Sequence, residues 1–169
     1  MIIKNFLLRS SFMVLFFVLI SLPQEVFPML KTKVLHPEIL AALAKAGHGA
    51  KIVIADSNYP FNVMSNPKSK KVYLNLMPGT VSLSEVLEAI VSAVEVESAQ
   101  AIYPDSGVEP AIFKDYKKIL PENTKIEKLG RFDFYKAAKG DDVCLVIATG
   151  EQMTWSCIIL TIGVVQPPK

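Results

Sequence analysis

The chain has 169 residues, of which 51% are hydrophobic and 20% are charged, and its formal net charge is +2. This composition favours a single globular domain with a packed core and excludes a disordered chain. We interpret the densest basic cluster, residues 68–71, as a solvated loop rather than a nucleic-acid patch, so no nucleic-acid partner is expected.

The N-terminal segment, residues 1–28, differs from the rest of the chain. Its apolar run over residues 12–22 is too short to span a bilayer but suits the core of a signal peptide. The residues that follow make a poor cleavage site, and the alternative is a start codon assigned too early, with translation beginning at Met29. The protein is cytoplasmic under the second interpretation and exported under the first. In both cases residues 1–28 are a leader, residues 29–169 form the domain, and no stable membrane association of the mature domain is expected.

Helical and strand patterns alternate after the leader. Pro37 suits a first helical turn and Gly47 can end the helix, which predicts a helix over residues 37–46. Ser82 and Glu85 have the spacing of a capping box, and apolar residues then recur at helical intervals. Further helices are predicted to open at Pro110 and to cover residues 132–138. The strands are predicted at residues 51–55, 72–76, 99–103, 125–129, 143–149 and 157–164.

This alternation predicts an α/β fold, a single domain with a mainly parallel sheet flanked by helices. In such sheets ligands bind beyond the carboxyl ends of the strands, where Asp56 and the pair Gly150-Glu151 are expected. No glycine-rich nucleotide motif is present. We interpret Cys144 and Cys157 as buried, reduced thiols, because no cysteine or histidine spacing suggests a metal site.

Two ionisable residues flank the first predicted strand. His48 lies in a glycine-rich turn, where an imidazole could act as an acid or base near neutral pH or could simply cap the turn. Asp56 follows the strand, where a carboxylate could bind a ligand or close an Asx-turn.

Three sequence blocks carry a resemblance to a known family. They are GHG at residues 47–49 with Asp56 and Pro60, GRFDFY at residues 130–135, and TGE at residues 149–151 with the apolar strand that follows. With these blocks, residues 29–165 resemble the D-ribose pyranase / L-fucose mutarotase family, and the second block is more similar to its fucose branch.

The resemblance implies an enzyme that interconverts the anomers of L-fucose or a related free monosaccharide, with no cofactor and no metal. His48 would be the catalytic acid or base, and Asp56 and Arg131 would bind the sugar. The alternative for Arg131 is a surface cation at a helix start, an electrostatically poor place for one. The resemblance also implies a homo-oligomer, a ring of subunits that is often a decamer, with sites near the subunit borders. We interpret the aromatic residues of the second block, Phe132, Phe134 and Tyr135, as core and subunit contacts.

The third block departs from the family pattern of a tyrosine, a small residue and an asparagine. Here the substrate-binding positions are Trp155, Ser156 and Cys157. Loss of a polar group that pairs with a buried hydroxyl costs about 1–3 kcal/mol. Ala50 also replaces an acidic residue that the fucose branch often carries. These changes keep two alternatives open: a non-catalytic monosaccharide-binding protein with a degenerate site, and an assembly subunit without a ligand.

Overall fold

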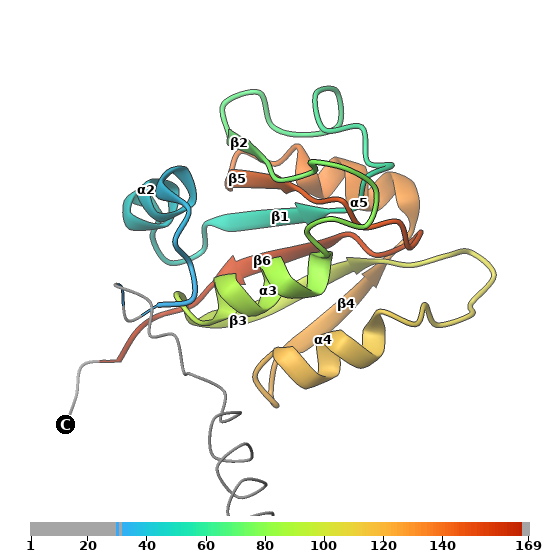
Figure 1. Cartoon of the computed structure of the whole chain (residues 1–169). Helices are drawn as coiled ribbons and strands as arrows, with labels where there is room; N and C mark the ends of the chain where they lie inside the picture. Colours follow the sequence, from blue (N-terminus) through green and yellow to red (C-terminus); the bar gives the residue numbers. More distant parts are fainter. Residues whose placement is uncertain (1–29, 31, 167–169) are drawn as a thin grey trace, which may run out of the picture.

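One sheet of six strands organises the fold, with the strand order β2-β5-β1-β6-β3-β4 (Figure 1). The computed structural model describes residue 30 and residues 32–166, so the predicted leader lies outside the described residues. The strands are β1 (Lys51–Ala55), β2 (Lys70–Tyr73), β3 (Val96–Ile102), β4 (Lys125–Leu129), β5 (Val143–Ala148) and β6 (Ile158–Ile162). The helices are α2 (Pro37–Lys45), α3 (Leu83–Val91), α4 (Phe113–Ile119) and α5 (Arg131–Ala138).

Strand β6 makes the sheet mixed. It runs antiparallel to both of its neighbours, β1 and β3, whereas the pairs β1–β5, β2–β5 and β3–β4 are parallel. All strands except β6 therefore point in one direction, and the predicted mainly parallel sheet is confirmed. Because β6 is reversed, the segment that precedes it lies at the edge where the other strands end.

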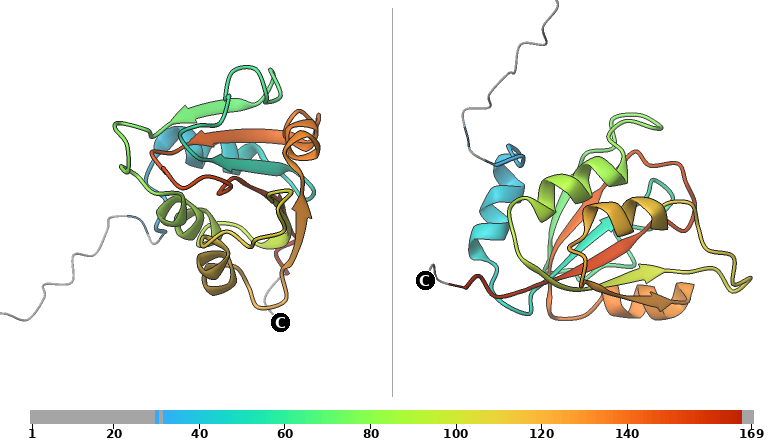
Figure 2. Two further views of the ribbon diagram at one scale, coloured as in Figure 1. Left: turned by 90° about the vertical axis from the view of Figure 1, so that its right-hand side faces the viewer. Right: turned by 90° about the horizontal axis from the view of Figure 1, so that it is seen from below.

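Helices cover both faces of the sheet. Helices α2, α3 and α4 pack on one face and α5 packs on the other, as the right-hand view of Figure 2 shows. The first face buries Ile39, Leu87 and Tyr116, and the second buries Phe134 together with Tyr59 from the loop after β1. The central strands β1, β5 and β6 are covered on both sides, which explains their nearly continuous apolar sequences.

Helix α3 begins where its capping box predicts. The Ser82 side chain accepts a hydrogen bond from the Glu85 backbone N–H, and the Glu85 carboxylate accepts one from the Ser82 backbone N–H at 2.8 Å. The bond from the Ser82 backbone N–H is the largest cause of a lowered pKa of Glu85, and the Ser82 hydroxyl, which donates to the same carboxylate oxygen at 2.8 Å, lowers this pKa further. An N-cap of this kind stabilises a helix by about 1 kcal/mol.

Two predicted strands are displaced along the chain. The strand predicted at residues 72–76 lies at Lys70–Tyr73, because its pairing with β5 ends at Ala148 and Leu76 N–H then turns back to the Leu74 carbonyl. Strand β3 begins at Val96, earlier than predicted, because it already pairs there with Ile162 of β6.

No helix in the described part of the chain is long and apolar enough to cross a membrane.

Gly150, two residues after the end of β5, packs directly against the loop that precedes α3. Its N–H donates to the Val81 carbonyl at 2.9 Å, and a Cβ at this position would lie 1.9 Å from the Thr80 carbonyl oxygen. We expect Gly150→Ala to lower the free energy of unfolding by about 3 kcal/mol, because backbone atoms must move to make room. Urea unfolding measures this. The control is Gly47→Ala, where nothing lies within 4 Å of the added Cβ and a change within about 0.5 kcal/mol is expected; equal effects of the two substitutions would contradict the packing.

Candidate functional site

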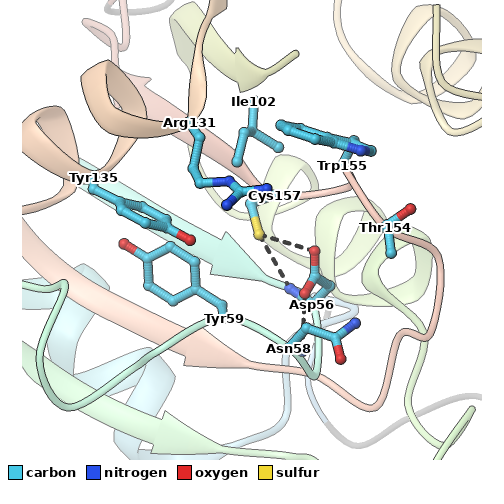
Figure 3. Close-up of a pocket in the computed structure, with 9 residues that line it drawn as sticks. All are labelled: Asp56, Asn58, Tyr59, Ile102, Arg131, Tyr135, Thr154, Trp155 and Cys157. Atoms are coloured by element: carbon cyan, nitrogen blue, oxygen red, sulfur yellow. Dashed lines mark hydrogen bonds between the residues drawn. The ribbon is translucent and has the colours of Figure 1, made fainter. Parts of the chain in front are cut away.

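A cavity of about 330 Å³ opens at the edge of the sheet where β1 and β3 end (Figure 3). Strand β4 ends at the same edge and leads into α5, and the reversed β6 begins there. The topology thus gathers residues that are far apart in the sequence. The lining residues are Asp56, Asn58, Tyr59, Ile102, Arg131, Tyr135, Thr154, Trp155 and Cys157.

Asp56 is the buried acidic residue of this cavity, with 5% of its surface exposed. Its Oδ1 accepts the Asn58 backbone N–H at 2.9 Å, so the Asx-turn considered above is present. Its Oδ2 lies 3.2 Å from the Cys157 Sγ. A carboxylate held in this way has a fixed orientation and still has acceptor positions for ligand hydroxyls.

Arg131 is the first residue of α5 and faces the same cavity (Figure 3). Its guanidinium carbon lies 5.4 Å from the centre of the Trp155 ring, a cation–π contact. A positive charge at a helix N-terminus is electrostatically unfavourable, so stability of the helix does not explain why Arg131 is at this position. A role of its guanidinium in the cavity explains the position better.

Trp155 has a left-handed backbone with φ of 62°, and it is the single non-glycine residue with positive φ in the described part of the chain. Such a conformation costs about 1–3 kcal/mol and is concentrated at functional sites. Neighbouring bonds hold it in place. The Ser156 hydroxyl donates to the Met153 carbonyl at 2.6 Å, and the buried Tyr116 hydroxyl donates to the Ser156 carbonyl. Trp155, three residues before β6 begins, is thereby fixed with its indole at the cavity wall.

Cys157 and Ser156 are buried at the base of the site. Cys157 exposes 2% of its surface, and burial, reinforced by the nearby Asp56 carboxylate, raises the pKa of its thiol well above the ordinary value. Both cysteines are free thiols, and the prediction that they are buried is confirmed for Cys157, whereas Cys144 is only partly buried. Ser156 is completely buried and does not line the cavity; its hydroxyl lies 3.5 Å from Asp56 Oδ2.

Several lining residues were not predicted as ligand contacts. Phe134 is a core residue as expected, but Tyr135 lines the cavity rather than only the core. Arg131 and Tyr135 are four residues apart on α5, and this spacing, which places both on one helix face, could have indicated the second residue. The Tyr59 hydroxyl donates to the Met64 carbonyl, and burial raises the pKa of this phenol. The further unpredicted lining residues are Asn58, Ile102 and Thr154.

His48 does not reach this cavity in a single chain. It precedes β1 whereas Asp56 follows it, and a five-residue strand separates its two ends by roughly 17 Å. The His48 side chain is 59% exposed, and its Nε2 lies 2.7 Å from Oε2 of Glu97 on β3. Glu97 therefore supplies a carboxylate beside the imidazole, although residue 50, two positions after His48, is an alanine and supplies none. The neutral ring that donates Nε2–H to Glu97 keeps Nδ1 as its proton acceptor.

Glu151 was expected at a strand end where ligands bind, but it is not part of the cavity lining and has a structural role. Its Oε1 accepts the Met153 backbone N–H at 2.9 Å, and its Oε2 lies 3.4 Å from the Leu83 backbone nitrogen at the start of α3. The carboxylate thus ties the loop before β6 to a helix N-terminus, where a negative charge is favourable. Among the residues that the structure describes, no group of three or more His, Cys, Asp or Glu side chains is placed to hold a metal ion.

The cavity combines a fixed carboxylate, a guanidinium, an amide, hydroxyls and an indole ring. Carboxylate and guanidinium groups hydrogen-bond hydroxyls in defined directions, and an indole packs on an apolar face of a ring. The arrangement is suited to a small polyol with one less polar face. The volume of about 330 Å³ lies at the low end of the range of small-molecule sites.

Comparison with known proteins gives consistent matches. Residues 29–165 match the family described as the RbsD / FucU transport protein family. The fucose mutarotase of Mus musculus is 34% identical over an alignment of 140 residues, which covers 78% of this chain and 90% of that protein. A D-ribose pyranase of Clostridium perfringens is 32% identical over 138 residues, which are 81% of this chain and 99% of that protein.

A solved structure extends the similarity to the fold. The crystal structure of the fucose mutarotase from Streptococcus pneumoniae in complex with L-fucose superposes with a TM-score of 0.68 at 30% sequence identity. The superposition covers 83% of this chain and all of that one. The mixed six-stranded sheet with its flanking helices is therefore shared over nearly the whole described domain.

Proposed function

The chain belongs to the RbsD / FucU family, and from that premise we propose that it is a cofactor-independent isomerase that interconverts the anomers of a free monosaccharide, L-fucose or a related sugar. The observation that supports this proposal most directly is that Asp56, Arg131 and Trp155 line the same cavity. The fucose mutarotase relatives favour L-fucose, and the D-ribose pyranase, at nearly equal identity, makes D-ribose the first sugar to compare with it.

The reaction needs only proton transfer and a held substrate. A base removes the proton of the anomeric hydroxyl, an acid protonates the ring oxygen, and the bond between the anomeric carbon and the ring oxygen breaks. The open-chain aldehyde rotates about the bond next to its carbonyl carbon. The reverse proton transfers close the ring as the other anomer. One well-placed acid or base accelerates such a step by about 10²–10⁴-fold.

In this proposal Asp56 and Arg131 orient the sugar hydroxyls, and Trp155 packs on the less polar face of the ring. Asp56 accepts hydroxyl hydrogens through its remaining acceptor positions, and Arg131 donates to hydroxyl oxygens. The Trp155 indole N–H is a further donor in place of the phenol of the family pattern. Orienting the ring limits the motion of the reacting oxygens relative to the acid or base.

His48 enters the site from a second copy of the chain in this proposal. Within one chain it lies beyond the opposite end of β1, so a neighbouring subunit must bring it to the cavity. Exposed apolar side chains near the cavity suit burial against such a neighbour. Phe132 is 79% exposed and packs against Tyr135 of the cavity lining, and the exposed Val108 and Met153 line an adjacent hollow that shares Trp155 with the cavity. Glu97 then holds the imidazole so that Nδ1 is the nitrogen that exchanges protons with the sugar.

The test is anomer exchange measured by saturation-transfer NMR on L-fucose, D-ribose and several other free monosaccharides. We expect the purified protein to accelerate exchange of at least one of them, with L-fucose among the fastest. The proposal is wrong if the protein accelerates none of these sugars.

A second candidate function is a monosaccharide-binding protein without catalytic activity. The tryptophan and cysteine at positions 155 and 157, where the family pattern has tyrosine and asparagine, favour it. It predicts saturable sugar binding without faster exchange, and it predicts that the double variant Trp155→Tyr, Cys157→Asn gains exchange activity. A double variant that binds sugar but gains no exchange would contradict a site made degenerate by these two residues.

A further inference from the structure

The Asp56 carboxylate is held from both sides by protein donors. On one side its Oδ1 accepts the Asn58 backbone N–H at 2.9 Å. On the other side two groups lie near Oδ2, the Cys157 Sγ at 3.2 Å and the Ser156 Oγ at 3.5 Å. Which of these two donates its hydrogen decides which residue positions the carboxylate.

The Ser156 hydroxyl donates its hydrogen to a different acceptor, the Met153 carbonyl. A hydroxyl carries one hydrogen, and the Ser156 Oγ lies 2.6 Å from the Met153 carbonyl oxygen, against 3.5 Å for the Asp56 carboxylate. The shorter bond takes the hydrogen, so Ser156 supports the turn before β6. The Cys157 S–H is then the side-chain donor to Oδ2 among the described residues.

The contact between Cys157 and Asp56 is reciprocal. The Asp56 backbone N–H donates to the Cys157 Sγ at 3.4 Å, and the Cys157 thiol donates to the Asp56 carboxylate at 3.2 Å. Both residues are almost completely buried, and in such surroundings of low dielectric a hydrogen bond is stronger than in water. One sulfur atom thus fixes the backbone and the side chain of Asp56 together.

We propose that Cys157 is a positioning residue, whose thiol orients the Asp56 carboxylate for sugar binding rather than contacting the sugar itself. The family pattern places an asparagine here, so this chain uses a different donor at the position. The raised pKa of the thiol agrees with this role, because the sulfur keeps its hydrogen at neutral pH and can donate it. Asp56 keeps an acceptor position on each oxygen for sugar hydroxyls.

The inference rests on the proposed function, since it assumes that Asp56 binds the sugar, but its first test does not require any sugar. The infrared S–H stretching band moves to lower frequency as the thiol donates a stronger hydrogen bond. The chain has two cysteines, and Cys144 donates to the neutral Lys51 carbonyl at 3.3 Å, so Cys144→Ser assigns the two bands. We expect the Cys157 band to lie at the lower frequency, because its acceptor is charged.

The decisive spectrum is that of Asp56→Asn, which keeps the shape of the side chain and removes its charge. We expect the Cys157 band to move to higher frequency and the Cys144 band to stay in place. A Cys157 band that does not move would overturn the proposal, whether or not the protein binds any sugar.

The second test measures sugar affinity by NMR titration of L-fucose. We expect Cys157→Ala to weaken binding about tenfold, since a buried hydrogen bond to a charged group is lost, and Cys157→Ser to stay within about threefold because it restores a donor. Cys144→Ser should bind as the wild type does. An unchanged affinity in folded Cys157→Ala would overturn the proposal. A wild-type protein that binds no sugar would instead contradict the proposed function, and the infrared spectra would then decide the role of Cys157.

Discussion

The substitution His48→Ala is expected to slow anomer exchange by about 10²–10⁴-fold, the contribution of one positioned acid or base. Sugar affinity should stay within about threefold, because the cavity residues that hold the ring belong to the other edge of the sheet. Saturation-transfer NMR measures the exchange rate, and titration measures the affinity. A loss of rate without a loss of binding would assign the imidazole to chemistry rather than to substrate contact.

The matched control is His36→Ala, since the chain has two histidines and His36 lies at the start of α2, away from the cavity lining. It should leave the exchange rate unchanged. If His48→Ala exchanges every sugar as fast as the wild type, the acid or base must be a residue of the cavity itself, such as Asp56 or Tyr135.

The second large effect is expected from Asp56→Ala, which should weaken sugar binding by about 10–150-fold, corresponding to the 1.5–3 kcal/mol of a hydrogen bond to a charged group. The carboxylate is buried and is oriented by Asn58 and Cys157. Among the lining residues of the cavity no second carboxylate is present that could replace it. Titration of L-fucose into the variant measures the loss.

The control for this substitution is Asp141→Ala, because the Asp141 side chain is 94% exposed and lies outside the cavity lining. It should bind sugar as the wild type does. Equal affinity of Asp56→Ala and the wild type would contradict a role of Asp56 in binding and would leave its Asx-turn as its whole function.

The sequence was informative wherever local patterns decide the structure. The capping box of Ser82 and Glu85 located α3, and the Val- and Ile-rich run located β1. The direction of β6 could not be read from its residues, because an apolar strand buried on both faces has the same composition in either direction. That reversal is what brings Trp155 and Cys157 to Asp56.

Only part of the candidate site could be predicted from the sequence. The family resemblance named Asp56, Arg131, Trp155 and Cys157, and the structure places all of them at one cavity. The hydrogen-bond partner of His48 could not be inferred, since Glu97 is far along the chain and meets the histidine only through the sheet. The resemblance assigned His48 and Asp56 to one site, whereas β1 holds them at opposite ends in one chain.

The central claim is that one site combines His48 of one subunit with Asp56 of its neighbour, and a mixing experiment tests it most directly. His48→Ala and Asp56→Ala chains, each nearly inactive alone, are produced together so that they assemble into shared oligomers. In a random mixture about a quarter of the sites then combine two intact partners, so exchange should recover to about a quarter of the wild-type rate. Mixed oligomers that remain as inactive as the separate variants would contradict a site shared between subunits.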